Sequence, residues 1–180
     1  FRFFIVLLIV YLLSELNIIN FNLFFISAAF FPVLISMDVI FQYFFNFNFI
    51  GMESYGHHNS SFFGDELIAG GYIQNFSFFS ILLLTYLLRN SKNIYKIALT
   101  TMVITTIGIG IMLSGNRMPF ALFLFGLFLF FFTHKELRKI VLISYFTIFI
   151  IFGAIKSSDV TMKNSYNSFY GVAQNTIVTI

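Results

Sequence analysis

Long apolar runs separated by short polar segments dominate this chain and limit what it can fold into. Hydrophobic residues make up 59% of the 180 residues, and charged residues make up only 9%. A soluble domain of this size usually carries about 25% charged residues. The apolar residues also come in continuous runs rather than in spaced stripes, so a lipid bilayer is the solvent to which this chain is suited.

Six apolar segments are candidates for transmembrane helices, at about residues 3–13, 21–36, 73–88, 97–113, 118–133 and 140–155. Crossing about 30 Å of hydrocarbon takes roughly 20 residues at 1.5 Å each, so the flanks of these segments must complete each crossing. Helices are favoured over barrel strands because no period-two alternation is visible, and a helix satisfies its own backbone hydrogen bonds. We therefore predict an all-α, polytopic transmembrane helical bundle forming one domain over residues 1–180. We expect it to be a fragment of a longer protein, with a large external loop beginning near residue 156.

The basic residues predict how this bundle is oriented. Six of the ten lie in two short loops, at 89–96 and 134–139, and an excess of Lys and Arg marks cytoplasmic loops. If the segments alternate, both loops fall on one side. The extracytoplasmic side then receives Asp38, Glu53, Asp65, Glu66, Asp159, His57, His58 and Arg117. On that side, the aromatic residues around 38–45 predict a short interfacial helix.

Several classes of function have no support in the sequence. The net charge of +3 is too small and too localised to indicate nucleic-acid binding, and cysteine is absent, which excludes thiolate metal sites. No Walker motif, HExxH or GxSxG pattern occurs. The sequence therefore does not favour ATP-driven transport, zinc proteolysis or serine hydrolysis.

Arg117 is the leading candidate for chemistry, in the segment SGNRMP between two apolar runs. Gly115 and Pro119 mark a break between two helices, so Arg117 is expected at a helix–helix corner near the outer interface. A guanidinium there can bind a phosphate or carboxylate through two parallel hydrogen bonds, and the free amides of the next helix could assist. The alternative is an arginine that only marks the interface.

A second candidate region is the segment GHHNSSFFGDELIAGG, which leads into an apolar run. His57 and His58 could act as a general base or as metal ligands, although their spacing matches no zinc motif. Asp65 and Glu66 could contact a substrate, or they could cap and stabilise the start of the following helix. Loop structure alone is an equally open explanation of this segment.

Two further pairs of residues are informative because of their spacing. Asp38 and Gln42 are four residues apart and would share one helix face with several aromatic residues. Such a face suits stacking on a sugar, and it suits a lipid interface equally well. Gly70 and Gly71 at a helix entry indicate close helix packing or a backbone that lies near a ligand.

Two elements of the sequence, taken together, resemble a known family. The segment SSFFGDELIAGGYIQNFS, followed two apolar runs later by LSGNRMPFALFLFGL, resembles O-antigen ligases and O-antigen polymerases, polytopic bacterial proteins that handle lipid-linked glycans. The arginine of the family's external turn corresponds to Arg117, and Ser114 and Gly115 correspond to its small residues. Asn116 stands where Ser or Glu is commoner, and Pro119 is less usual, so the corner differs in detail.

The resemblance covers about residues 21–180 and implies an enzyme of the bacterial inner membrane that is similar to C-type glycosyltransferases. Such an enzyme transfers a glycan from undecaprenyl diphosphate at the extracytoplasmic face. For a polymerase, the acceptor is another lipid-linked repeat unit. For a ligase, the acceptor is a lipid A core sugar, and the product is lipopolysaccharide. The resemblance implies that Arg117 stabilises the departing diphosphate, that Ser114 lies in the substrate site, and that no metal or cofactor takes part. The general base would be a histidine of the external loop after residue 156, so that role is not transferred to His57 or His58.

Two other functions stay open. A transporter or flippase of a lipid-linked or anionic solute would carry charged residues within its spans or broken helices at mid-membrane. The segment TTIGIGIML, with Gly108 and Gly110, is the one stretch that could be flexible in this way. A structural membrane subunit would meet a partner and carry no chemistry.

Overall fold

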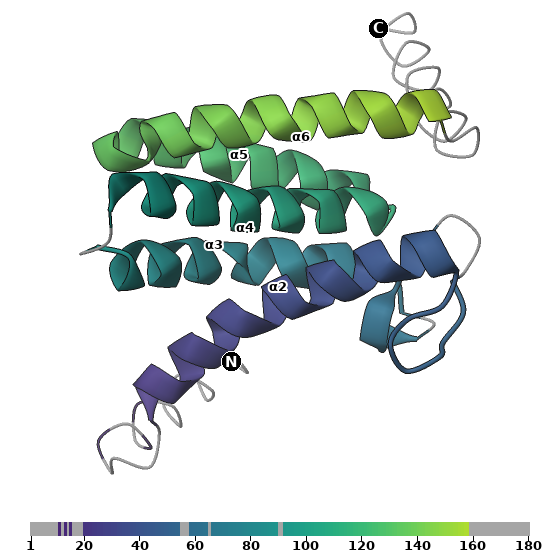
Figure 1. Cartoon of the computed structure of the whole chain (residues 1–180). Helices are drawn as coiled ribbons and strands as arrows, with labels where there is room; N and C mark the ends of the chain where they lie inside the picture. Colours follow the sequence, from purple (N-terminus) through teal and green to yellow (C-terminus); the bar gives the residue numbers. More distant parts are fainter. Residues whose placement is uncertain are drawn as a thin grey trace, which may run out of the picture.

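The protein is a bundle of α-helices with one oblique member (Figure 1). The computed structural model describes Tyr11, Leu13, Glu15 and residues 20–54, 58–64, 66–89 and 92–158, without the side chains of 136 and 156–158. These residues form no β-strand and five α-helices: α2 (Phe21–Phe45), α3 (Ala69–Leu87), α4 (Asn93–Leu113), α5 (Arg117–Thr133) and α6 (Arg138–Ser158). Two 3-10 helices, η1 (Ser61–Phe63) and η2 (Lys135–Leu137), precede α3 and α6. The prediction of an all-α fold is confirmed.

Three of the helices are long and apolar enough to cross a membrane: Phe21–Phe45, Asn93–Leu113 and Arg138–Ile155. The last five predicted segments coincide with α2 to α6, whereas the first, at 3–13, lies almost wholly outside the described residues. The expected total of six spans is not confirmed. With 17 residues, α5 reaches only about 25 Å at 1.5 Å per residue, and α3 carries several polar residues in its first half.

The predicted interfacial helix around 38–45 is wrong, because these residues form the last part of α2. The helix runs without interruption through Pro32, and the Ser36 Oγ donates to the Pro32 carbonyl at 2.6 Å. The predicted span ends at residue 36, which places the polar residues near 38 outside it. Asp38 and Gln42 instead lie buried on the protein-facing side of the same helix. Because water does not reach them there, they need hydrogen-bond partners from the protein.

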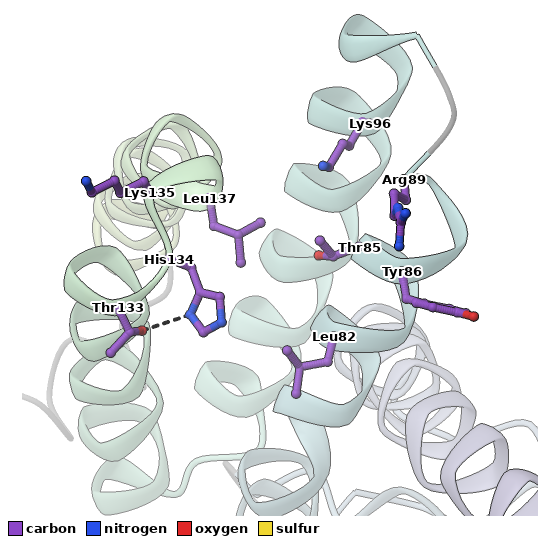
Figure 2. A pocket seen from close by; sticks show the side chains of 9 residues that line it. All are labelled: Leu82, Thr85, Tyr86, Arg89, Lys96, Thr133, His134, Lys135 and Leu137. Atoms are coloured by element: carbon purple, nitrogen blue, oxygen red, sulfur yellow. Dashed lines mark hydrogen bonds between the residues drawn. The ribbon is translucent and has the colours of Figure 1, made fainter.

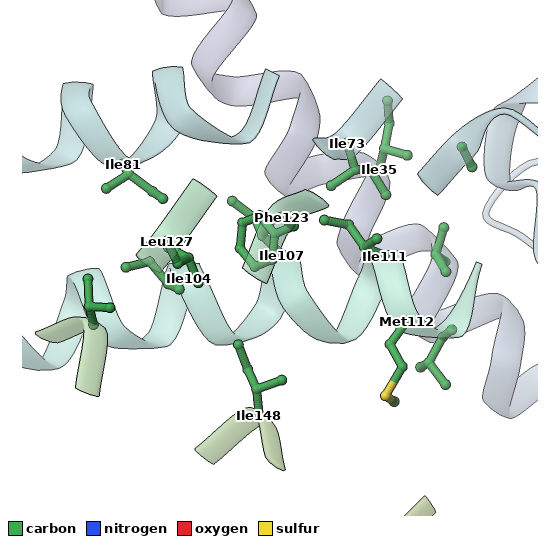
Figure 3. Packing of buried hydrophobic residues seen from close by; sticks show 14 of the residues in the cluster. Ile35, Ile73, Ile81, Ile104, Ile107, Ile111, Met112, Phe123, Leu127 and Ile148 are labelled. Atoms are coloured by element: carbon green, nitrogen blue, oxygen red, sulfur yellow. The ribbon is translucent and has the colours of Figure 1, made fainter. Parts of the chain in front are cut away.

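The core is centred on α4, which packs against each of the other four α-helices. Its isoleucines at 104, 107 and 111 are almost completely buried and face α3, α5 and α6 in Figure 3. Two glycines of α4 permit close approach: a Cβ on Gly108 would lie 2.7 Å from the Ile148 Cδ1, and one on Gly110 would lie 2.8 Å from the Ser36 Cα. Small residues at helix contacts are typical of packing within membranes. α4 is continuous through both glycines, so they serve packing rather than a break.

The outward faces of the bundle are apolar as well. Large side chains exposed on the surface include Phe30 of α2, Phe125 of α5 and Phe146 of α6, each more than half exposed. Helices that are apolar on all sides belong in a membrane or a large core, and exposed apolar patches of this extent are rare on soluble monomers. The surface and the three candidate spans together support membrane association.

The loops gather at two ends of the bundle. The basic end contains the loops at 88–92 and 134–137, whose side chains line shared cavities. The corner end contains the segment 46–68 and the α4–α5 turn at 114–116, which hydrogen bonds connect. The two basic loops therefore do lie together, opposite Arg117, as the alternation of spans predicted. Which end faces the cytoplasm stays a prediction.

Candidate functional site

Arg117 lies at a tight corner between two antiparallel helices, as the sequence predicted. α4 ends at Leu113, and Gly115 takes a φ of 81°, a left-handed conformation that favours glycine. Asn116 then returns the chain to extended geometry, and Arg117 is the first residue of α5. Its side chain is half-buried.

The first turn of α5 is arranged electrostatically for an anion. The amides of a helix's first turn have no partner within the helix, and the helix dipole gives them a partial positive charge. Asn116 is the N-cap residue but its side chain makes no capping hydrogen bond, and the turn contains no acidic residue. The dipole disfavours a cation at this position by about 0.3–1 kcal/mol. The helix dipole therefore gives no reason for a cation here, and Arg117 belongs to the same turn as these amides.

The corner is seated directly on the start of α3. The Asn116 Nδ2 donates to the Leu67 carbonyl at 2.8 Å, and the Ser114 Oγ donates to the Ile111 carbonyl at 2.7 Å. A Cβ on Gly70 would lie 2.3 Å from the Ser114 Oγ and 3.0 Å from the Asn116 Cβ. Of the two explanations given for these glycines, close packing therefore holds for Gly70. Ser114 is itself buried, and the hydrogen bond that its hydroxyl donates goes to the protein backbone.

A groove of about 490 Å³ adjoins the corner, between the starts of α3 and α5. Its lining is mostly apolar and includes Leu67, Ile68, Gly71, Tyr72, Asn75, Phe76, Asn116 and Pro119. Gly71 has open space where a Cβ would stand, in contrast to its neighbour Gly70. The groove thus places an apolar surface beside the positively charged start of α5.

Asp38 and Gln42 share one face of α2, as predicted, and both are completely buried. The Asp38 Oδ1 accepts from the Phe49 amide at 2.9 Å, and its Oδ2 accepts from the Ser61 Oγ at 2.5 Å. The Gln42 Oε1 accepts from the Ser61 amide at 2.8 Å, and its Nε2 donates to the Met52 carbonyl at 3.4 Å. These hydrogen bonds anchor the segment after α2 to the helix, so the two side chains position that segment.

The remaining candidates lie in the segment that leads into α3. His57 and Asp65 fall outside the described residues. His58 is half-buried and Glu66 is exposed. Of the alternatives for Glu66, a place in the first turn of α3 is contradicted. The Glu66 amide closes a turn onto the Phe63 carbonyl at 3.1 Å, and α3 begins only at Ala69.

Metal binding is one of the predicted alternatives for the segment that contains His57 and His58. Among the residues that the structure describes, no three His, Cys, Asp or Glu side chains lie close enough together to hold a metal ion. No described arrangement therefore assigns a cofactor to this end of the bundle.

Two polar residues that position the corner end are not among the predicted site residues. The Asn59 Nδ2 donates to the Leu113 carbonyl at 2.7 Å and so ties the segment between α2 and α3 to the end of α4. The Asn48 Nδ2 donates to the Ser61 carbonyl at 2.7 Å. Asparagine is common throughout this chain, so no local signal separates these side chains from the others.

The geometry of the corner end thus combines a half-buried arginine, an uncapped helix start and an apolar groove on a loop held by buried hydrogen bonds. Such a site can attract an anionic group that carries an apolar tail. No protein-family model matches the chain, and neither does any curated protein or solved structure.

Proposed function

We propose that the chain is part of a bacterial inner-membrane glycan polymerase or ligase. It would transfer an oligosaccharide from undecaprenyl diphosphate to a sugar acceptor at the extracytoplasmic face, in the assembly of O-antigen or another surface polysaccharide. The observation that carries the proposal is the position of Arg117 at the uncapped start of α5. The resemblance of the segments around Ser114 and Gly70 to O-antigen ligases and polymerases supplies the reaction class.

In this reaction an acceptor hydroxyl attacks the anomeric carbon, and the bond from that carbon to the diphosphate oxygen breaks. Negative charge builds on the leaving diphosphate. A fixed guanidinium and helix amides stabilise that charge more in the transition state than in the ground state, which is the requirement for catalysis. The hydroxyl proton passes to a general base, which the resemblance locates in the loop after residue 156. The groove lined by Tyr72 and Phe76 offers an apolar surface for the first units of the polyprenyl chain.

The competing proposal of a transporter or flippase receives less support from the described helices. α4 is unbroken through Gly108 and Gly110. Asp38, the acidic residue buried within α2, has both carboxylate oxygens engaged by the adjoining segment. Neither feature resembles a midplane binding site for a solute.

The test uses the full-length gene in a host that lacks it, with Arg117→Ala and Arg117→Lys assayed for surface polysaccharide by gel electrophoresis. Removing one donor to a developing oxyanion typically costs about 10²–10³-fold in rate. We therefore expect polysaccharide to fall at least about 100-fold for alanine. For lysine, which keeps the charge but loses the paired hydrogen bonds, we expect a smaller but clear loss. The banding pattern distinguishes polymerisation from ligation.

Arg138→Ala is the matched control, because Arg138 is also half-buried but lies at the basic end. Membrane levels of all variants are compared by immunoblot. Full activity of Arg117→Ala at normal membrane level would reduce Arg117 to an interface anchor and remove the basis of the proposal. Equal losses for Arg117→Ala and Arg138→Ala would indicate a general effect of removing an arginine.

A further inference from the structure

We propose that the basic end of the bundle binds an anionic phospholipid. Its phosphodiester would contact Arg89 and Lys96, and an acyl chain would lie on the apolar wall below them. This inference needs only that the bundle lies in a membrane, and it is independent of the glycosyl transfer proposed for the corner end.

The site is a cavity of about 500 Å³ formed by the end of α3, the start of α4 and the loop between α5 and α6. α3 contributes Leu82, Thr85 and Tyr86, and Arg89 follows just after the end of that helix; α4 contributes Lys96; the loop after α5 and its flanks contribute Thr133, His134, Lys135 and Leu137. Figure 2 shows Lys96 and the His134 ring directed into the gap from opposite sides. The lining thus combines cationic groups with apolar ones.

The cationic and apolar groups are separated along the helix axis. In Figure 2, Lys96 and Arg89 lie toward the end of the bundle, and Leu82 lies deeper. Arg89 follows Leu82 by seven residues, which is about 10 Å along a helix. A phospholipid has the same polarity, with its phosphate at the level of the helix ends and its acyl chains further in. Tyr86, 72% exposed, stands between these levels, where tyrosine is enriched in membrane proteins.

A further cation of this end, Arg138, contacts the protein rather than the cavity. The Arg138 Nε donates to the Phe131 carbonyl at 3.0 Å, and its guanidinium lies 5.7 Å from the centre of the Phe131 ring. Arg138 therefore fixes the loop. Lys135 points away from the gap in Figure 2 and contributes at the rim.

The positive charge also continues beyond the first cavity. Lys96 and Lys135 line a second cavity of about 370 Å³ together with Lys139. Glu136 belongs to the same loop, and its side chain is outside the described residues. Arginine can bind a phosphodiester through two parallel hydrogen bonds, and lysine adds a point charge. Basic pockets between transmembrane helices are the arrangement that binds anionic headgroups.

A lipid is favoured over a soluble phosphate because of the apolar wall. Leu82 is 45% exposed and Tyr86 is 72% exposed, so the wall below the cations leaves apolar surface uncovered. A free phosphate would use only Arg89 and Lys96 and would leave this apolar surface uncovered. A phospholipid uses both parts of the lining.

The experiment uses the purified full-length protein in neutral detergent, titrated with phosphatidylglycerol or phosphatidylcholine and followed by native mass spectrometry. We expect tighter binding of phosphatidylglycerol. Each of Arg89→Gln and Lys96→Gln should weaken it about fivefold, the factor equivalent to about 1 kcal/mol per basic residue near a membrane surface. Lys92→Gln is the matched control, because it removes a charge from the same loop but Lys92 lines neither cavity.

A second arm separates lipid from soluble anion. Glycerophosphoglycerol, the headgroup without acyl chains, should bind at least tenfold more weakly than the lipid, and Leu82→Asn should weaken only the lipid. Equal binding of the two phospholipids would overturn the proposal. So would an equal effect of Lys92→Gln, or headgroup binding as tight as that of the lipid. Circular dichroism confirms that each variant keeps its helical content.

Discussion

The two ends of the bundle use polar residues in opposite ways. At the corner end, Asp38, Gln42 and Asn59 are buried, and their hydrogen bonds go to the protein's own backbone and to Ser61. At the basic end, Arg89 and the other cations around the cavities are mostly exposed. The buried polar groups of the corner end hold its loop in place, whereas the cations of the basic end are mostly exposed on the surface. Substitutions should therefore change stability at the corner end and affinity at the basic end.

The largest effect on stability is expected for Asp38→Ala. The change leaves the Ser61 hydroxyl and the Phe49 amide without their acceptors. An unsatisfied buried polar group costs about 1–3 kcal/mol, so we expect a loss of about 2–4 kcal/mol for the pair. Thermal unfolding in detergent micelles, followed by circular dichroism, measures the loss. Faster cleavage after Glu53 by a Glu-specific protease would show that the anchored segment has come loose.

Glu66→Ala is the control for that substitution, since it removes an exposed acid from the same end. It should leave both the unfolding temperature and the cleavage rate unchanged. If the two variants behave alike, the corner end is not held by its buried polar groups, and the contrast between the ends disappears.

A pair of adjacent glycines gives the next effect. Gly70→Ala drives a Cβ to 2.3 Å from the Ser114 Oγ, which forces the α4–α5 turn to shift at a cost of about 1–3 kcal/mol. Gly71→Ala meets open space and should stabilise α3 by about 0.5–1 kcal/mol through helix propensity. Opposite shifts of the unfolding temperature are the expected result. A loss for both, or for neither, would mean that the turn does not rest on α3 at Gly70.

The smallest effect on stability is expected at the basic end. Arg138→Ala loses one hydrogen bond to the Phe131 carbonyl and one contact with its ring, each worth about 0.5–1.5 kcal/mol at most in a partly exposed site. We expect a total loss of about 1 kcal/mol. Lys139→Ala, at an exposed neighbouring position, should change stability by less than about 0.5 kcal/mol. A loss for Arg138→Ala as large as that for Asp38→Ala would contradict the comparison.

The helices could be predicted from the sequence because the membrane allows few alternatives. Apolar runs set the bounds of α3 to α6 within a few residues, and Gly115 marked the corner that places Arg117 at the start of α5. Both predictions use local signals. A glycine that permits a left-handed turn predicts a turn in almost any fold. A long apolar run likewise predicts a buried or membrane-spanning segment.

The role of Asp38 could not be predicted in the same way. A carboxylate and an amide four residues apart follow an apolar run whether the chain leaves the membrane or turns them inward. The deciding partners are Phe49 and Ser61, which come 11 and 23 residues later. For the start of α3, the sequence leaves open a helix cap at Asp65 and Glu66, whereas the structure has a turn closed between Phe63 and Glu66 and a helix that begins at Ala69. Partners distant in the sequence decided the case of Asp38.

The hydrogen bonds that cover Asp38 and Gln42 also bear on how the chain enters the membrane. At about 5–20 residues per second, the roughly 70 residues from the end of α2 to the end of α4 take several seconds to synthesise. Until then α2 lacks α4, one of the two α-helices against which it packs. The segment through Ser61 emerges much earlier, and it alone supplies the groups that satisfy both buried side chains. The two buried side chains of α2 can therefore be satisfied before α3 and α4 are made, whereas Asn59 in the same segment finds its partner, the Leu113 carbonyl, only when α4 is complete.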